Sequence, residues 1–160
     1  MKVNFTLNGE ETTLEAEPSE LLVDVLRLKL GLRGARPGCL QGQCGSCTVL
    51  FNGALAASCL IPVFKAERAE ILTIEGLMQS RGYQDIERGF TRAGAEPCRF
   101  CAAGKFLSIH ALLLSGTSPS QESIQAALTG VWCRCTTYDR LIKAIEYTAE
   151  IRERRLRRAR

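Results

Sequence analysis

The spacing of four cysteines constrains the fold of this chain more than any other feature of its sequence. Within a stretch rich in glycine and small residues, successive cysteines are separated by four, two and eleven residues. These four are Cys39, Cys44, Cys47 and Cys59. A fold that uses them together must return the last one across the longest gap, so we expect the chain to reverse direction there.

Four further cysteines form two short pairs, Cys98 with Cys101 and Cys133 with Cys135. The start, MKVNFTLNGEETTLEAE, lacks the charged-then-apolar order of a signal peptide, and no apolar run reaches the roughly 18 residues of a membrane span. We therefore expect a cytoplasmic protein without a membrane partner. Thiols stay reduced in that compartment, so eight closely spaced cysteines favour metal binding over disulfides.

The formal net charge of +4 is concentrated at the C-terminal end. Residues 152–160 carry six arginines and one glutamate, which leaves the rest of the chain close to neutral. Such an arginine-rich tail is typical of a solvated helix end, and less often of a dock for an acidic partner. Nothing else in the sequence indicates a nucleic-acid partner, and we expect none.

Residues 1–77 are expected to form a small mixed sheet with one helix. Alternating apolar residues at 3–7 predict a strand, and Asn8-Gly9 predicts a tight turn into a second strand. Ser19 is predicted to cap a helix, and Gly31 is predicted to end it.

A second hairpin explains the longest gap between the cysteines. If Asn52-Gly53 forms a two-residue turn, pairing back along the strands places Cys59 beside Cys47. Residues 67–77 then indicate a last strand that leads into a short helix.

Residues 84–151 are expected to form a compact bundle of four helices after a linker at 78–83. Helical spacing of apolar residues recurs at 83–94, at 102–116, at 118–130 and from 138 onward. Ser118 is predicted to begin the third helix in a capping box with Gln121. Both cysteine pairs come just before a helix, where free N–H groups and the positive end of the helix dipole favour thiolates.

The choice of metal depends on the spacing of the first four cysteines. Tetrahedral zinc sites usually use two short pairs, whereas this pattern is that of plant-type [2Fe-2S] proteins. Gly38, Gly42 and Gly45 are expected to take positive φ and to let backbone N–H groups point at the cluster sulfurs. The second set of cysteines is less specific by itself, because it could bind zinc or one of several clusters.

Five segments together carry a family resemblance. They are PGCLQGQCGSCTVLFNG, SCL, TIEGL, CRFCAAG and CRCTTYDRLIKAI. In this order and spacing they closely resemble the small iron-sulfur subunit of the molybdenum hydroxylases, the xanthine oxidase family. The resemblance covers about residues 1–150 and matches all eight cysteines to ligands of that family. It implies an α+β fold in which a plant-ferredoxin-like β-grasp domain precedes a four-helix-bundle domain, each with one [2Fe-2S] cluster.

The resemblance also implies partner subunits. The cluster on Cys98, Cys101, Cys133 and Cys135 would lie next to molybdopterin in a large catalytic subunit, with Cys135 near the pterin. The cluster on the first four cysteines would pass electrons to FAD in a medium subunit. The chain itself would carry out electron transfer without substrate chemistry, since its sequence has no Ser-His-Asp set, P-loop or paired carboxylates.

Several residues of the second half depart from the family pattern. Pro97 replaces a glutamine that contacts the pterin in the family, and proline offers neither a side-chain amide nor an N–H group. We therefore do not expect that contact here. Arg99 and Arg134 adjoin ligands and would offset cluster charge or reach solvent. Trp132 would shield the second cluster, or belong to the core or an interface, and His110 is expected to be packed rather than to bind metal.

Two other functions are consistent with the residues alone. One is a free-standing ferredoxin with two clusters, which would favour an acidic docking face. The other is a zinc-binding interaction module.

Overall fold

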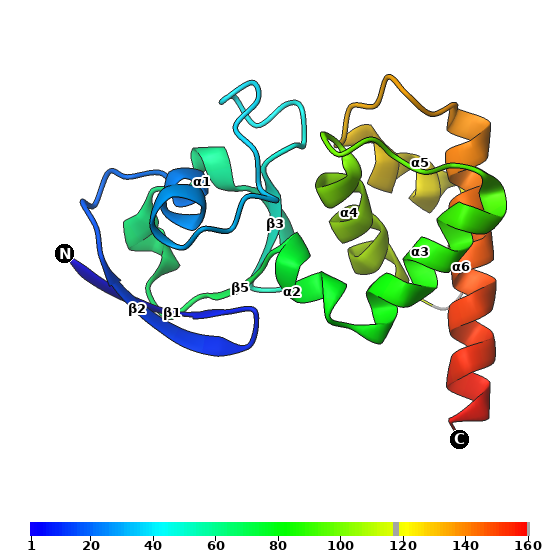
Figure 1. The fold of residues 1–160 in the computed structure, drawn as a ribbon, viewed down its shortest axis with the longest axis horizontal. Helices are drawn as coiled ribbons and strands as arrows, with labels where there is room; N and C mark the ends of the chain where they lie inside the picture. The colour runs from blue at the N-terminus through cyan, green and yellow to red at the C-terminus, as the bar shows by residue number, and fades with distance from the viewer. Residues whose placement is uncertain (117–118, 160) are drawn as a thin grey trace.

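The computed structural model describes residues 1–116 and 119–159, which form a five-stranded mixed sheet followed by helices (Figure 1). The strands are β1 (Lys2–Leu7), β2 (Glu10–Glu15), β3 (Thr48–Phe51), β4 (Ala54–Ala57) and β5 (Glu70–Leu72). Their order in the sheet is β2-β1-β5-β3-β4. β1 and β5 run parallel, and the other neighbours run antiparallel. The predicted mixed sheet is confirmed, and we call this half the sheet domain.

Both predicted hairpins form, with two-residue turns at 8–9 and 52–53 in which every residue has positive φ. The register of β3 and β4 is the predicted one. It continues past the strands, because the Ser58 N–H donates to the Cys47 carbonyl oxygen at 3.2 Å. Cys59 follows in a short 3-10 helix, Ser58–Leu60, and is thereby returned to the neighbourhood of Cys47.

The helix of the sheet domain begins later than predicted. It consists of α1 (Leu22–Asp24) and a π-helical segment (Val25–Lys29), and Gly31 follows with φ +71°. Ser19 does not cap it, so that prediction was wrong. Leu21 forms an isolated antiparallel bridge with Pro62 and is the extended N-cap residue of α1, which leaves Ser19 two residues before the cap position. A further 3-10 helix spans Val63–Ala66.

Five helices complete the chain. They are α2 (Ile74–Met78), α3 (Arg81–Ala93), α4 (Ala102–Ser115), α5 (Gln121–Thr129) and α6 (Tyr138–Arg158). The four predicted helices of the second half are α3 to α6, which we call the helical domain. The residues predicted as a linker, 78–83, are mostly helical. The Ser80 hydroxyl accepts a hydrogen bond from the Tyr83 N–H at 3.1 Å and caps α3, so only residues 79–80 separate α2 from α3. Ser118 lies outside the described residues, and the residue that caps α5 is Ser120.

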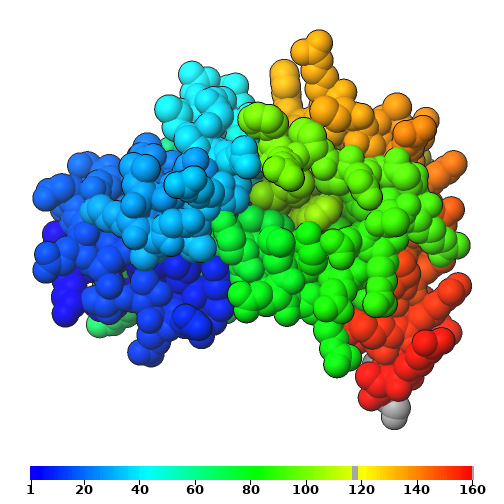
Figure 2. Space-filling view, viewed as in Figure 1, coloured from blue at the N-terminus to red at the C-terminus, as the bar shows by residue number. Residues whose placement is uncertain are grey.

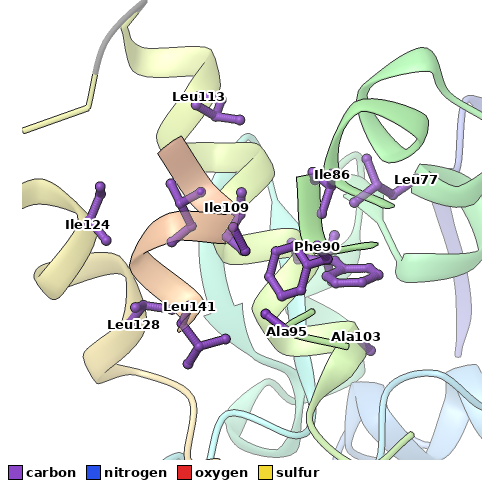
Figure 3. Packing of buried hydrophobic residues seen from close by; sticks show 14 of the residues in the cluster. Leu77, Ile86, Phe90, Ala95, Ala103, Ile109, Leu113, Ile124, Leu128 and Leu141 are labelled. Carbon is purple, nitrogen blue, oxygen red and sulfur yellow. The ribbon is translucent and has the colours of Figure 1, made fainter. Parts of the chain in front are cut away.

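Two hydrophobic cores hold the chain together. The first packs the sheet against α1, with Val3, Leu22 and Leu26 fully buried. The second lies among the helices, where the Phe90 ring of α3 packs edge-on against Phe106 of α4 at 5.1 Å between ring centres, and the cluster extends to side chains of α5 and α6 (Figure 3). Leu77 of α2 packs in this second core, although it falls within the predicted residues 1–77. The predicted domain limits of 1–77 and 84–151 stay a prediction.

The arginine-rich residues 152–158 continue α6 rather than forming a separate tail. Arg155 donates three hydrogen bonds to the Asp85 carboxylate of α3, the shortest at 2.7 Å, and that carboxylate is almost completely buried. The end of α6 projects beyond the body of the protein at the lower right of Figure 2. No helix in the described part of the chain is long and apolar enough to cross a membrane.

Candidate iron-sulfur centres

The loop at residues 38–47, here the first cysteine loop, wraps backbone N–H groups around one sulfur. The N–H groups of Gln41, Gln43 and Cys44 lie 3.4, 3.2 and 3.4 Å from the Cys39 Sγ atom. These donors, that of Gln41 foremost, lower the pKa of Cys39 to about 6. The loop therefore stabilises negative charge on sulfur before any metal is present.

Glycines allow this loop to close. Gly42 and Gly45 have positive φ, as predicted. Gly38 does not, so the prediction was wrong for that residue. Its role is close approach, because a Cβ atom there would lie 2.8 Å from the Cys44 sulfur. Leu40 also takes positive φ, at 55°, which no sequence signal indicated.

The other two cysteines of the first set lie deeper. Cys47 and Cys59 are both buried, at the end of the loop and beyond β4. Burial, with the nearby Cys59 sulfur adding to it, raises the pKa of Cys47 to about 11. The hairpin thus brings Cys59 to Cys47, as the sequence predicted. The set contains one thiol that ionises easily and one that ionises only when an electrophile such as a metal replaces its proton.

The second set of cysteines meets where two helices begin. Cys101 immediately precedes α4, and its Sγ atom lies 3.7 Å from the Sγ atoms of both Cys98 and Cys133. Hydrogen bonds from the N–H groups of Cys101 and Phe100 lower the pKa of Cys98 to about 7. Burial, followed by its two sulfur neighbours, raises the pKa of Cys101 to about 12.

The loop before α6 supplies the last two sulfurs. Burial raises the pKa of Cys133, but the N–H groups of Cys135 and Thr136, the Cys101 thiol and the positive charge of Lys105 outweigh it and lower the pKa overall. Cys135 is exposed, and contact with Cys98 raises its pKa. The four sulfurs of this set are therefore linked in a chain of neighbours, as the sequence predicted for two helix ends that meet.

The donor chemistry of both sets fits a [2Fe-2S] cluster. Such a cluster takes four thiolates, two at each iron, and is favoured by N–H groups that point at sulfur. Each set offers four thiols and at least one sulfur surrounded by N–H donors.

The two sets of cysteines are joined by direct backbone contact. The Trp132 N–H, next to Cys133, donates to the carbonyl oxygen of Cys44 at 3.2 Å. A Cβ atom at Gly104, in α4, would collide with the carbonyl oxygen of Gly45. The first cysteine loop, residues 97–101 and residues 131–137 lie along one side of the protein, the upper side in Figure 1. Sequence reasoning missed this contact, because Gly45 and Gly104 are far apart in the sequence and only the folded chain brings their backbones together.

The residues that flank these sites have distinct surroundings. Trp132 and Phe100 are 79% and 71% exposed, so neither belongs to the core. The Arg36 guanidinium lies 5.3 Å from the centre of the Phe100 ring and links the two domains. His110 is partly buried in α4, away from both cysteine sets, and its Nδ1 atom makes no hydrogen bond among the described residues.

Comparison with known proteins agrees with this geometry. Residues 5–70 match the family described as 2Fe-2S iron-sulfur cluster binding domain, and residues 73–146 match the family described as [2Fe-2S] binding domain. The small FeS subunit of nicotinate dehydrogenase from Eubacterium barkeri is 36% identical over 92% of this chain and 94% of its own length. Isoquinoline 1-oxidoreductase subunit alpha from Brevundimonas diminuta is 35% identical over 92% and 97%, respectively.

Solved structures extend the similarity to the whole fold. A chain of quinoline 2-oxidoreductase from Pseudomonas putida 86 superimposes with a TM-score of 0.87 at 38% identity, covering 96% of both chains. Aldehyde oxidoreductase from Desulfovibrio desulfuricans gives 0.86 at 34% identity, and the present chain spans 17% of it. Fold and sites define a two-domain iron-sulfur protein with two [2Fe-2S] clusters. The chain belongs to the small iron-sulfur subunits of the molybdenum hydroxylases, the xanthine oxidase family.

Proposed function

We propose that this chain relays single electrons between two partner subunits of a molybdenum-dependent oxidoreductase. Each bound [2Fe-2S] cluster supplies the chemistry of accepting and releasing one electron. The chain supplies the thiolates, the N–H groups around them and the fixed distance between the sites. The ligands of the first cluster would be Cys39, Cys44, Cys47 and Cys59, and those of the second Cys98, Cys101, Cys133 and Cys135.

The observation that carries this proposal is the hydrogen bond from the Trp132 N–H to the Cys44 carbonyl oxygen. Cys44 is a proposed ligand of the first cluster, and Trp132 is bonded to Cys133, a proposed ligand of the second. One hydrogen bond and one peptide unit therefore connect the two ligand sets. A relay needs such a short connection, whereas a zinc-binding interaction module does not.

The orientation of the relay is the one that the family resemblance implies, and the exposure of Cys135 agrees with it. Cys135 is exposed, and we infer that this end faces molybdopterin in a large catalytic subunit. The first cysteine loop would then face FAD in a medium subunit. Pro97 cannot donate a hydrogen bond, so the pterin would be held by backbone groups or by the large subunit. A structure of the complex with a side chain from residues 96–104 bonded to the polar edge of the pterin would contradict this.

Substrate choice is assigned to the large subunit. Proteins named for nicotinate, isoquinoline, quinoline and aldehydes all match this chain, so the iron-sulfur fold itself does not select among substrates. All eight cysteines are free thiols in the structure, which agrees with a complex assembled in the reducing cytoplasm.

The test is to purify the chain with its partners and measure iron, acid-labile sulfide and zinc. About four irons and four sulfides per chain are expected, together with two distinct paramagnetic signals after reduction. Substrate of the large subunit should reduce both centres in the complex but neither in the isolated chain. Stoichiometric zinc without sulfide would refute the iron-sulfur function. Reduction of the isolated chain by a diffusing reductase, without any copurifying subunit, would instead indicate a free-standing ferredoxin.

A further inference from the structure

The helical domain buries a cation beside the second set of cysteines. Lys105 lies in the first turn of α4 and is 1% exposed. The ion pairs among the described residues involve Lys29 and four arginines, but not Lys105. A buried ammonium group is costly unless an anion compensates it. A source of negative charge nearby would therefore stabilise Lys105 in this position.

The surroundings of Lys105 identify that source. Lys105 and Cys133 both line a surface pocket of about 310 Å³ between α4, α5 and the start of α6. Four thiolates, two ferric irons and two sulfides sum to a charge of about −2, and reduction by one electron makes it about −3. A cluster held by these four cysteines would place that negative charge beside the pocket that Lys105 and Cys133 line.

The other cations near this site differ from Lys105 in exposure. Arg99 and Arg134 are each adjacent to a ligand in sequence, but both are exposed, where solvent and salt screen their charge. Lys105 is almost fully covered by protein and meets solvent through this pocket, so solvent and salt screen its charge less than those of the two arginines.

We propose that Lys105 is the internal counter-charge of the second cluster and raises its reduction potential, so that this cluster accepts an electron from the donor subunit more readily. This inference rests on the proposed function, because it requires a cluster on Cys98, Cys101, Cys133 and Cys135. The reduced cluster is more negative than the oxidised one, so a fixed positive charge stabilises the reduced form more.

The experiment is a redox titration of the full-length, cluster-loaded chain, followed by electron paramagnetic resonance. The signal of the second cluster is identified by its perturbation in Cys135→Ser. Lys105→Met is expected to lower the potential of this cluster so that its reduced-to-oxidised ratio at a fixed potential falls about tenfold, or about 59 mV for one electron. The first cluster should not change. Lys105→Arg should restore the potential, and exposed Lys143→Met in α6 should have no effect.

Each outcome decides the matter. Unchanged potentials in a fully loaded Lys105→Met variant would overturn the inference, as would equal shifts in Lys105→Met and Lys105→Arg. If Lys105→Met and Lys105→Gln lose only the second cluster while Lys105→Arg keeps it, the charge is required for assembly and the inference stands. Loss of that cluster in all three variants would indicate a packing role and overturn it. Failure of the proposed function is recognised separately, because the unmodified chain would then lack two [2Fe-2S] signals.

Discussion

At the scale of single residues, the ligand thiols differ widely in acidity although their chemistry is the same. Three N–H groups surround the Cys39 sulfur, whereas Cys47 is buried among apolar side chains. Neither difference is visible in the cysteine spacing. At Cys39 the acidity arises from the positive φ angles at Leu40 and Gly42, which turn successive N–H groups toward the sulfur. At Cys47 it is set by burial.

This difference predicts the alkylation of the iron-depleted chain. The thiolate is the nucleophile, so Cys39, with a pKa of about 6, should react with iodoacetamide at a rate that stops rising above about pH 7. Cys47, with a pKa of about 11, should react slowly at pH 7, and its rate should still rise at pH 9. Peptide mass spectrometry over a pH series measures both rates. If the rate for Cys39 were half-maximal near pH 8.5, the pKa of an ordinary thiol, the surrounding N–H groups would not be lowering its pKa.

At the scale of elements, the end of α6 is fixed to α3 by one ion pair. The Asp85 carboxylate is 2% exposed and the Arg155 side chain is 31% exposed. A second pair, between Arg157 and Glu153, lies within α6 and is largely exposed, which makes it a suitable control. The two pairs have the same chemistry but different burial, so their energies should differ.

Replacement of Arg155 should destabilise the chain more than replacement of Arg157. Arg155→Met leaves the Asp85 carboxylate buried without its partner, and we expect a loss of about 2–3 kcal/mol in the free energy of unfolding, since the arginine itself is partly exposed. Arg157→Met should cost less than about 1 kcal/mol. Urea unfolding of the loaded chain, followed by circular dichroism of the helices, measures both values. Equal effects of the two substitutions would show that Arg155 acts only as a surface charge.

At the scale of the whole molecule, the relay depends on how closely the two domains approach. Gly104 of α4 lies against the Gly45 backbone, and a Cβ atom at Gly45 would in turn lie 2.8 Å from the Val131 Cα atom. These contacts hold the first cysteine loop against the loops of the second set. Gly104 is helical and has no positive φ, so a substitution there tests proximity without backbone strain.

Gly104→Ala should separate the domains while leaving both ligand sets intact. The added methyl group must displace the Gly45 carbonyl oxygen, which we expect to cost about 1–3 kcal/mol despite the better helix propensity of alanine. The magnetic interaction between the two reduced clusters should weaken, and electron transfer between them should slow. Gly116→Ala, where none of the described residues beyond the chain neighbours comes within 4 Å of the added group, is the control. An unchanged interaction in a fully loaded Gly104→Ala variant would mean that this contact does not set the distance between clusters.

Much of this architecture could be predicted from the sequence, and the exceptions have physical reasons. Asn-Gly turns and the interval between Cys47 and Cys59 depend on local geometry, so the hairpin register was predictable. The failed Ser19 cap and the close approach at Gly104 depend on residues far away in the sequence, such as Pro62 and Gly45. Lys105 was missed for the same reason, since a lysine in a helix normally faces water and only the assembled bundle encloses it.

The short connection through Trp132 and Cys44 also limits how this protein can change in evolution. Because it consists of main-chain atoms, side chains other than those at Gly45 and Gly104 can vary without breaking it. Insertions or deletions beside either cysteine would shift the two peptide groups out of register. We therefore expect the loops that carry Cys44 and Trp132 to tolerate changes of surface side chains but not changes of length.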